Sequence, residues 1–269
     1  MIQLEFAESE RAAAEIFTRL AAAADEFEGY AHPHAARVAK LADEVAKLFR
    51  LARADRSSLR FAALLHDVGE MAMRRDYIQR AGPLNEEERL DLARHPVIGE
   101  QEAARAGADR GAQLIVRWHH EWWNGGGYPD ALRREQVPLA ARILRVADSY
   151  AALTDARPFR AAGTVAEARR HLAQWAGLEF DPHVVSAFLS LENLAELRSY
   201  ADETRAADQR AERATATVSH DATTTAAPSA YDHANSPPSD AGAAPSGAGA
   251  ISSDAGGISS EPSRTSSER

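Results

Sequence analysis

The 269-residue chain contains no cysteine, and it lacks any run of about 18 or more apolar residues. Without cysteine it can form neither disulfides nor thiolate metal sites, so any metal must be held by histidine, carboxylate or water. Without long apolar runs it is predicted to have no membrane span. The N-terminal stretch MIQLEFAESER also lacks the basic start and apolar core of a signal peptide. We therefore expect a cytoplasmic protein.

Basic residues are also in deficit, with 31 lysines and arginines against 40 acidic residues and a net charge of −9. Proteins that bind DNA or RNA polymers usually carry a basic surface, so we expect no such partner. A small anionic ligand stays compatible with the sequence, because a local cluster of arginines or a metal can outweigh the global charge.

Large apolar residues become scarce near residue 200. Residues 205–269 consist mainly of Ala, Ser, Gly, Thr and Pro. Such a segment cannot offset the entropy cost of ordering, so we predict a disordered tail at 205–269.

The preceding residues are predicted to form an all-α fold. A buried helical stripe with spacing i, i+3, i+4, i+7 is formed by Phe61, Leu64, Leu65 and Val68. Signals for helix starts are Asn85 with Glu88, Thr164 with Glu167, and Asp181 with Pro182. We predict an N-terminal helix within residues 1–30 and a helical domain over residues 31–200. The helix is expected either to pack on that domain or to mediate dimerisation.

Polar residues interrupt two of the apolar helices. His66 and Asp67 lie between Leu65 and Val68 of the stripe in LRFAALLHDVGE, and Asp148 lies among aliphatic residues in ARILRVADSYAAL. A buried ionised carboxylate is costly unless it is paired or bound to a metal. For Asp148 alone, pairing with Arg145 or Arg157 remains an alternative to metal binding.

The stretch HHEWWNGGGYP, residues 119–129, places two histidines before a glycine-rich loop. His119 and His120 differ by about 100° around a helix, so both can reach a metal only near the end of that helix. The glycines Gly125–Gly127 permit positive φ and a close approach of the backbone to a ligand.

Seven candidate ligands are spread over several predicted helices: His34, His66, Asp67, His95, His119, His120 and Asp148. Nitrogen and oxygen donors without cysteine suit Fe, Mn, Zn, Co or Ni. Asp67 is the natural carboxylate to bridge two ions. Two metals about 3.5–4 Å apart would clamp a phosphoryl group and activate a water.

The ordered series HD with Gly69, HPVIG, HHE…NGGGYP and VAD…LTDARPFR resembles the HD-GYP subgroup of the HD-domain phosphohydrolases. The resemblance implies a helical HD-domain bundle and a metal centre, often of iron or manganese. It implies hydrolysis of cyclic di-GMP to pGpG, and in some members to GMP, by a hydroxide that bridges the metals. The seven candidate ligands each match a metal-binding position of the family.

The same resemblance assigns further roles. Residues expected to contact the substrate are Gly127, Tyr128, Pro129, Arg157 and Arg160. Asp67 and Glu70 are the expected catalytic residues. Family members usually carry lysine where this chain has Glu70, and this change places an anion near the developing phosphate charge and is expected to lower turnover.

Two other departures bear on the site. Members with three metals place a glutamate four residues before the first histidine, where this chain has Tyr30, so we expect two divalent ions, iron or manganese. Ala151 replaces a usual aspartate. These departures leave two alternatives open: a catalytically weak module that binds cyclic di-GMP or a protein partner, and a phosphohydrolase of another cyclic dinucleotide or nucleotide. Self-association as a homodimer also stays open.

Overall fold

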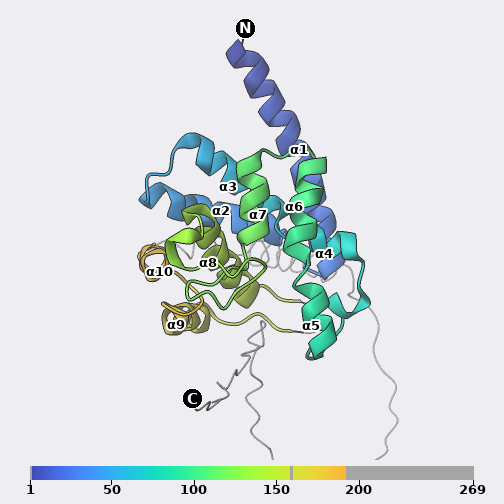
Figure 1. Ribbon diagram of the computed structural model, residues 1–269, viewed down its shortest axis with the longest axis vertical. Coiled ribbons are helices and arrows are strands. Elements are labelled where there is room, and N and C mark those ends of the chain that lie inside the picture. Colours follow the sequence, from blue (N-terminus) through green and yellow to red (C-terminus); the bar gives the residue numbers. More distant parts are fainter. Residues whose placement is uncertain (1, 158–159, 192–269) are drawn as a thin grey trace, which may run out of the picture. The chain divides into compact units, whose positions relative to one another are not determined.

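The computed structural model describes residues 2–157 and 160–191, with side chains from Arg11 onward (Figure 1). The longer helices are α1 (Ile2–Glu28), α2 (His34–Leu48), α3 (Arg53–Leu65), α6 (His95–Arg105), α7 (Arg110–Trp118), α8 (Leu139–Thr154), α9 (Val165–Trp175) and α10 (Pro182–Leu189). The shorter helices are α4 (Val68–Met73), α5 (Glu86–Leu92), η1 (Asp76–Ile78) and η2 (Arg134–Gln136). Among the described residues only isolated β-bridges occur, which confirms the all-α prediction. The predicted tail lies outside the described residues.

The core forms where α2, α3, α7 and α8 pack against one another. On α2 the side chains of Val38, Leu41 and Val45 are fully buried, and on α8 those of Ile143 and Leu144 are too. Burying an aliphatic side chain of this size contributes about 1.5–3 kcal/mol, so this packing holds α2 and α8 together. α6 lies beside α7 and also packs on α4. Figure 1 shows α6 and α4 on the right of the bundle.

Helix starts follow the sequence signals. Thr164 and Glu167 form a reciprocal capping box at α9, as do Asn85 and Glu88 at α5. At α10 the side chain of Asp181 accepts a hydrogen bond from a backbone N–H. These caps satisfy N–H groups that have no partner within the helix.

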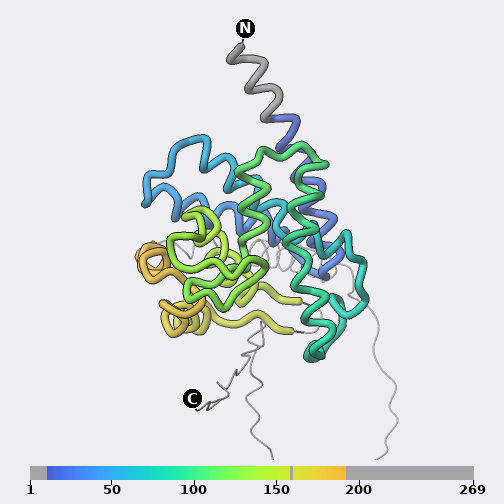
Figure 2. The backbone as a smooth tube through the Cα atoms, in the orientation of Figure 1, coloured from blue at the N-terminus to red at the C-terminus, as the bar shows by residue number. Residues whose placement is uncertain are grey.

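The N-terminal helix packs on the bundle. Phe17, Ala21 and Ala24 of α1 are buried, and α1 contacts α2, α3 and α4. Figure 2 shows the darkest blue part of the tube, which is the later part of this helix, running along the bundle. The Phe17 ring meets the Phe61 ring edge-on, with centroids 5.0 Å apart. This helix therefore contributes directly to the core of the bundle. No helix within the described ranges is long and apolar enough to cross a bilayer.

Close packing of α4 on α6 depends on Gly69. A Cβ built at Gly69 would lie 2.1 Å from the carbonyl oxygen of His95. Only glycine permits this approach, which brings Asp67, immediately before α4, close to His95 at the start of α6.

We expect the substitution Gly69→Ala to destabilise the fold by about 1–3 kcal/mol, because the backbone of α6 must move to admit the methyl group. The free energy of unfolding can be measured in urea. Gly126→Ala is a matched control, because its Cβ would meet the flexible side chain of Asn124 at 3.1 Å rather than a backbone atom. Equal losses in the two variants would contradict this account of Gly69.

Candidate metal centre

The structure brings the seven candidate ligands together from helix ends and from one helix interior. His34 and His95 are the first residues of α2 and α6, and His66 and Asp67 join α3 to α4. The remaining candidates are His119 and His120, directly after α7, and Asp148 in α8. The rings of His34, His66, His95 and His119 are almost completely buried. The predicted termination of a helix at the paired histidines is confirmed.

Asp67 lies between two groups of potential ligands. One group contains Asp67, His34 and His66, and the other contains Asp67, His95, His119 and His120. Oδ2 of Asp67 is 2.9 Å from Nε2 of His66. Oδ1 is 3.6 Å from Nε2 of His95 and 3.7 Å from Nε2 of His119. Its two oxygens therefore face different groups, as a bridging carboxylate requires.

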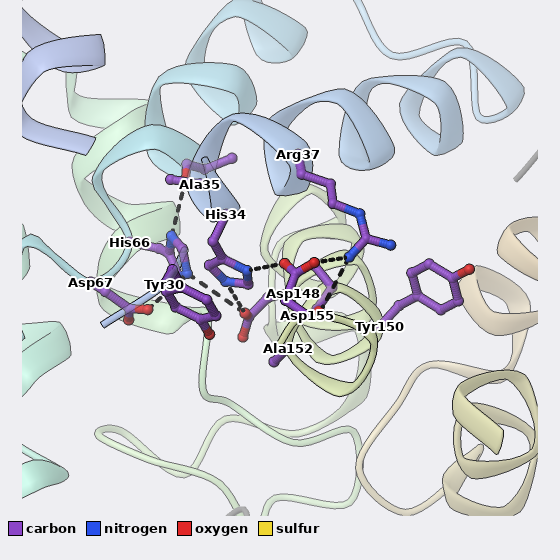
Figure 3. A network of polar contacts seen from close by, with 12 residues as sticks. Tyr30, His34, Ala35, Arg37, His66, Asp67, Asp148, Tyr150, Ala152 and Asp155 are labelled. Carbon is purple, nitrogen blue, oxygen red and sulfur yellow. Dashed lines mark hydrogen bonds and ion pairs between the residues drawn. The ribbon is translucent and has the colours of Figure 1, made fainter. Parts of the chain in front are cut away.

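Asp148 joins the group that contains His34 and His66 (Figure 3). Its Oδ1 is 3.4 Å from Nε2 of His34 and 3.6 Å from Nε2 of His66. Of the two partners considered from the sequence, Arg145 lies 3.7 Å from Oδ2, beyond hydrogen-bond distance, and Arg157 pairs with Glu28. The carboxylate therefore faces the histidines through one oxygen and the guanidinium through the other.

Three histidines are oriented by backbone carbonyls. Each donates from Nδ1 to the carbonyl three residues earlier: His66 to Ala63 at 2.9 Å, His95 to Leu92 at 2.8 Å and His119 to Val116 at 2.6 Å. In the neutral ring this bond leaves a lone pair on Nε2, the atom that faces Asp67. The buried Nε2 atoms of His34 and His66 make no hydrogen bond. Buried nitrogen lone pairs beside carboxylates fit a divalent metal.

His120 has the opposite hydrogen-bond arrangement. Nη1 of Arg145 donates to Nδ1 of His120 over 2.9 Å, so the neutral ring carries its proton on Nε2. Burial, together with the nearby His119 and Arg145, lowers the pKa of His120 well below its usual value and keeps the ring neutral. Metal binding through Nε2 would require the other tautomer, with the proton on Nδ1, and therefore release of the contact with Arg145. The Tyr128 ring stacks on His120, with centroids 4.8 Å apart.

The electrostatics of the cluster favour a cation. Burial opposes ionisation of Asp67, yet His66 and His119 together hold the pKa of its carboxyl well below the usual value. Burial likewise opposes ionisation of Asp148, but the adjacent His34 and His66 lower the pKa of its carboxyl well below the usual value. Burial lowers the pKa of His95 to about 3, so this ring stays neutral. Burial opposes protonation of His34 and His66, yet the neighbouring carboxylates raise the pKa of both rings, that of His66 well above its usual value. A metal would displace these protons, because metal ligands must be deprotonated.

Glu70 points toward the cluster. Its Oε1 is 3.9 Å from Nδ1 of His95, and only 12% of its side chain is exposed. Burial first, and then the negative charge of Asp67, raises the pKa of Glu70 to about 8, while Arg157 opposes this rise. Glu70 therefore holds a proton at neutral pH.

Arg157 and Arg160 make contacts within the protein. Nη2 of Arg157 is 2.7 Å from Oε2 of the buried Glu28, and the guanidinium lies 4.1 Å from the centroid of the Tyr30 ring. The Tyr30 ring in turn stacks on His34, with centroids 4.0 Å apart. Arg160 donates to the carbonyl of Ala152. The end of α1 thus reaches the candidate centre through Glu28 and, just beyond it, Tyr30.

The loop that contains Gly125–Gly127 is anchored by Glu121, a residue that the sequence motifs did not single out. The buried carboxylate of Glu121 accepts hydrogen bonds from the N–H of Asp130 at 2.6 Å and of Leu132 at 3.0 Å. A Cβ at Gly127 would lie 2.3 Å from the backbone nitrogen of Trp122, so this turn requires glycine. Of the three glycines expected to permit positive φ, Gly125 has a φ of 85°. Glu121 directly follows the paired histidines in the sequence, and this position is the one sequence feature that could have drawn attention to it.

Two further buried carboxylates near the candidate centre were not predicted from the sequence. Asp155 lies 3.0 Å from Nδ1 of His34, and Glu179 lies 2.5 Å from Nη2 of Arg145. Both are far in sequence from the residues they contact, so no local pattern pointed to them.

Comparison with known proteins agrees with this geometry. A family model described as HD domain matches residues 17–184. The chain belongs to the HD-domain family, which confirms the family expected from the sequence motifs.

Several curated relatives share the same region. The chain is 37% identical over 178 residues to the cyclic di-GMP phosphodiesterase response regulator RpfG of Xanthomonas campestris, which covers 65% of this chain and 47% of the relative. It is 32% identical over 164 residues to a cyclic di-GMP phosphodiesterase of Thermotoga maritima, covering 60% and 44%. A 3'3'-cGAMP-specific phosphodiesterase 2 of Vibrio cholerae is 30% identical over 158 residues, covering 58% and 30%. The chain spans less than half the length of each.

A solved structure supports the fold. The crystal structure of a cyclic GMP-AMP specific phosphodiesterase of V. cholerae aligns with a TM-score of 0.56 at 19% identity, covering 71% of this chain and 52% of that one. At this identity the likeness concerns the helical bundle alone.

The raised pKa of Glu70 predicts a pH-dependent stability of the metal-free protein. The carboxyl titrates near 4.5 when unperturbed and near 8 in the fold. Between these values the unfolded chain binds fewer protons than the folded chain, so the free energy of unfolding falls as the pH rises. We expect Glu70→Gln to be more stable than wild type above about pH 8 and to match it below about pH 4.5. Urea unfolding at both pH values measures this difference, and a difference that does not change with pH would contradict the assignment.

Proposed function

We propose that the chain is a metal-dependent phosphodiesterase that hydrolyses cyclic di-GMP to pGpG or GMP. The observation that carries the proposal is the position of Asp67 between two groups of histidines. Relatives named as cyclic di-GMP phosphodiesterases support the substrate class. Location in the cytoplasm and self-association remain predictions from the sequence.

The proposed centre holds two divalent ions, iron or manganese. One would be bound by His34, His66, Asp67 and Asp148, and the other by Asp67, His95, His119 and His120. When bound, such ions supply neutralisation of phosphate charge and activation of a water for in-line attack. A count of two is supported by Tyr30, whose ring occupies one face of His34 and whose hydroxyl meets Arg157.

The surrounding side chains would act on the substrate and on its protons. The stack of Tyr128 on His120 would present that tyrosine and its loop to a nucleotide. Arg157 would exchange part of its contact with Glu28 for a substrate phosphate, because guanidinium groups bind phosphate oxygens bidentately. Glu70, which holds a proton in the metal-free protein, is the proposed donor to the leaving 3′-oxygen, and bound cations would lower its pKa and so favour the transfer.

A product assay tests the proposal. The full chain, purified without oxygen and supplied with Fe(II) or Mn(II), is incubated separately with cyclic di-GMP and with 3'3'-cGAMP. We expect pGpG or GMP from cyclic di-GMP, and Asp67→Asn should lower the rate by about 100-fold or more, because it removes the shared carboxylate charge.

The control variant is Asp109→Asn, which changes a helix-capping carboxylate outside the metal cluster. It should leave the rate within about two-fold of wild type, since a cap acts chiefly on stability. Hydrolysis of cGAMP alone would favour a related phosphohydrolase. Bound metal and bound cyclic di-GMP without product would favour the binding module.

A further inference from the structure

His34 lacks the backbone support that His66, His95 and His119 share. Those rings follow a helix or a helical turn, so the carbonyl three residues earlier points at Nδ1. His34 follows Pro33, whose backbone is not helical, with φ −63° and ψ 85°. Its Nδ1 instead meets Oδ2 of Asp155 at 3.0 Å, across 121 residues of sequence.

We propose that Asp155 is a positioning residue that fixes the His34 ring for metal binding, an inference that rests on the proposed metal centre. An ionised carboxylate cannot donate a hydrogen bond, so a neutral imidazole that bonds to it must direct its N–H at the carboxylate. Asp155 therefore places the proton of His34 on Nδ1 and leaves the Nε2 lone pair directed at Asp148. Figure 3 shows His34 between these two carboxylates.

Asp155 is itself held rigidly. Its Oδ1 accepts from Nη1 of Arg37 over 2.5 Å, and the same Nη1 reaches the carbonyl of Ala151 at 3.3 Å. The backbone N–H of Asp155 also donates to that carbonyl, at 2.8 Å, at the end of α8. Arg37 lies one turn after His34 on α2, so both oxygens of Asp155 tie the end of α8 to the start of α2.

Two contacts then fix the orientation of the His34 ring. Tyr30 stacks on its face with an interplanar angle of 4°, which sets the plane of the imidazole. Asp155 sets the rotation within that plane through Nδ1. Neither restraint touches His95 or His119, so the effect of Asp155 is confined to the metal that His34 would bind.

The test is a Mn(II) titration of the full-length chain, followed by isothermal calorimetry and by the electron paramagnetic resonance of free Mn(II). Both oxygens of Asp155 face donors, so the amide in Asp155→Asn must direct its NH₂ at either His34 or Arg37. We expect this variant to bind one Mn(II) about 10–100-fold more weakly and the other unchanged, as loss of a partner hydrogen-bonded to a ligand does.

A second variant, Arg37→Lys, keeps the charge but loses the double contact with Asp155 and Ala151. It should weaken the same metal by a smaller factor. The matched control is Asp181→Asn, which disturbs a buried carboxylate paired with Arg142 near the start of α8 and should lower the Tm without changing either Mn(II) affinity.

The outcomes separate the two proposals. Two Mn(II) ions bound equally well by wild type and Asp155→Asn, with only a lower Tm in the variant, would overturn the positioning role alone. Wild-type protein that binds no Mn(II) or Fe(II) would overturn the metal centre and this role together. Weakening of both sites to the same extent would overturn the claim that Asp155 acts on His34 alone.

Discussion

The rest of the site depends on one interaction, the contact of the buried Asp67 carboxylate with two groups of imidazoles. An ionised carboxylate in such an environment is stable only beside compensating positive charge or hydrogen-bond donors. In the metal-free chain the compensation comes from the histidines, which lower its pKa. Divalent ions would supply it more fully. The fold serves this contact because α4 and α6 approach closely at Gly69, which places Asp67 beside His95.

Much of the fold and of the site follows from local sequence patterns. The apolar stripe through Phe61 and Leu65 predicted a buried α3, and the cap at Thr164 predicted the start of α9. The same reasoning placed the paired histidines after the end of a helix, where α7 indeed ends at Trp118. These features depend on residues a few positions apart, so sequence spacing alone is informative.

Contacts between distant segments could not be predicted in this way. Asp155 faces His34 across 121 residues, and Arg145 faces Glu179 across 34. Nor could spacing show that Arg145 donates to His120, which sets the proton of that ring on Nε2. Such contacts arise from how the helices pack, and they decide tautomers and charges that residue identity leaves open.

The departures from the family pattern form a connected group around the proposed metal centre. Tyr30 stacks on His34 and meets Arg157, and Arg157 also pairs with Glu28. Arg157 is at the same time the nearby cation that opposes the raised pKa of Glu70. The positive charge that a lysine usually provides is thus replaced by a protonated carboxyl backed by an arginine. The charge at this position therefore differs from that of the usual lysine.

Anomalous X-ray diffraction from crystals of the Mn(II)-loaded chain tests the shared role of Asp67 most directly. The account predicts two peaks about 3.5–4 Å apart, one on each side of the Asp67 carboxylate, with the first contacted by His34 and the second by His95. A single peak, or peaks that Asp67 does not touch, would contradict it.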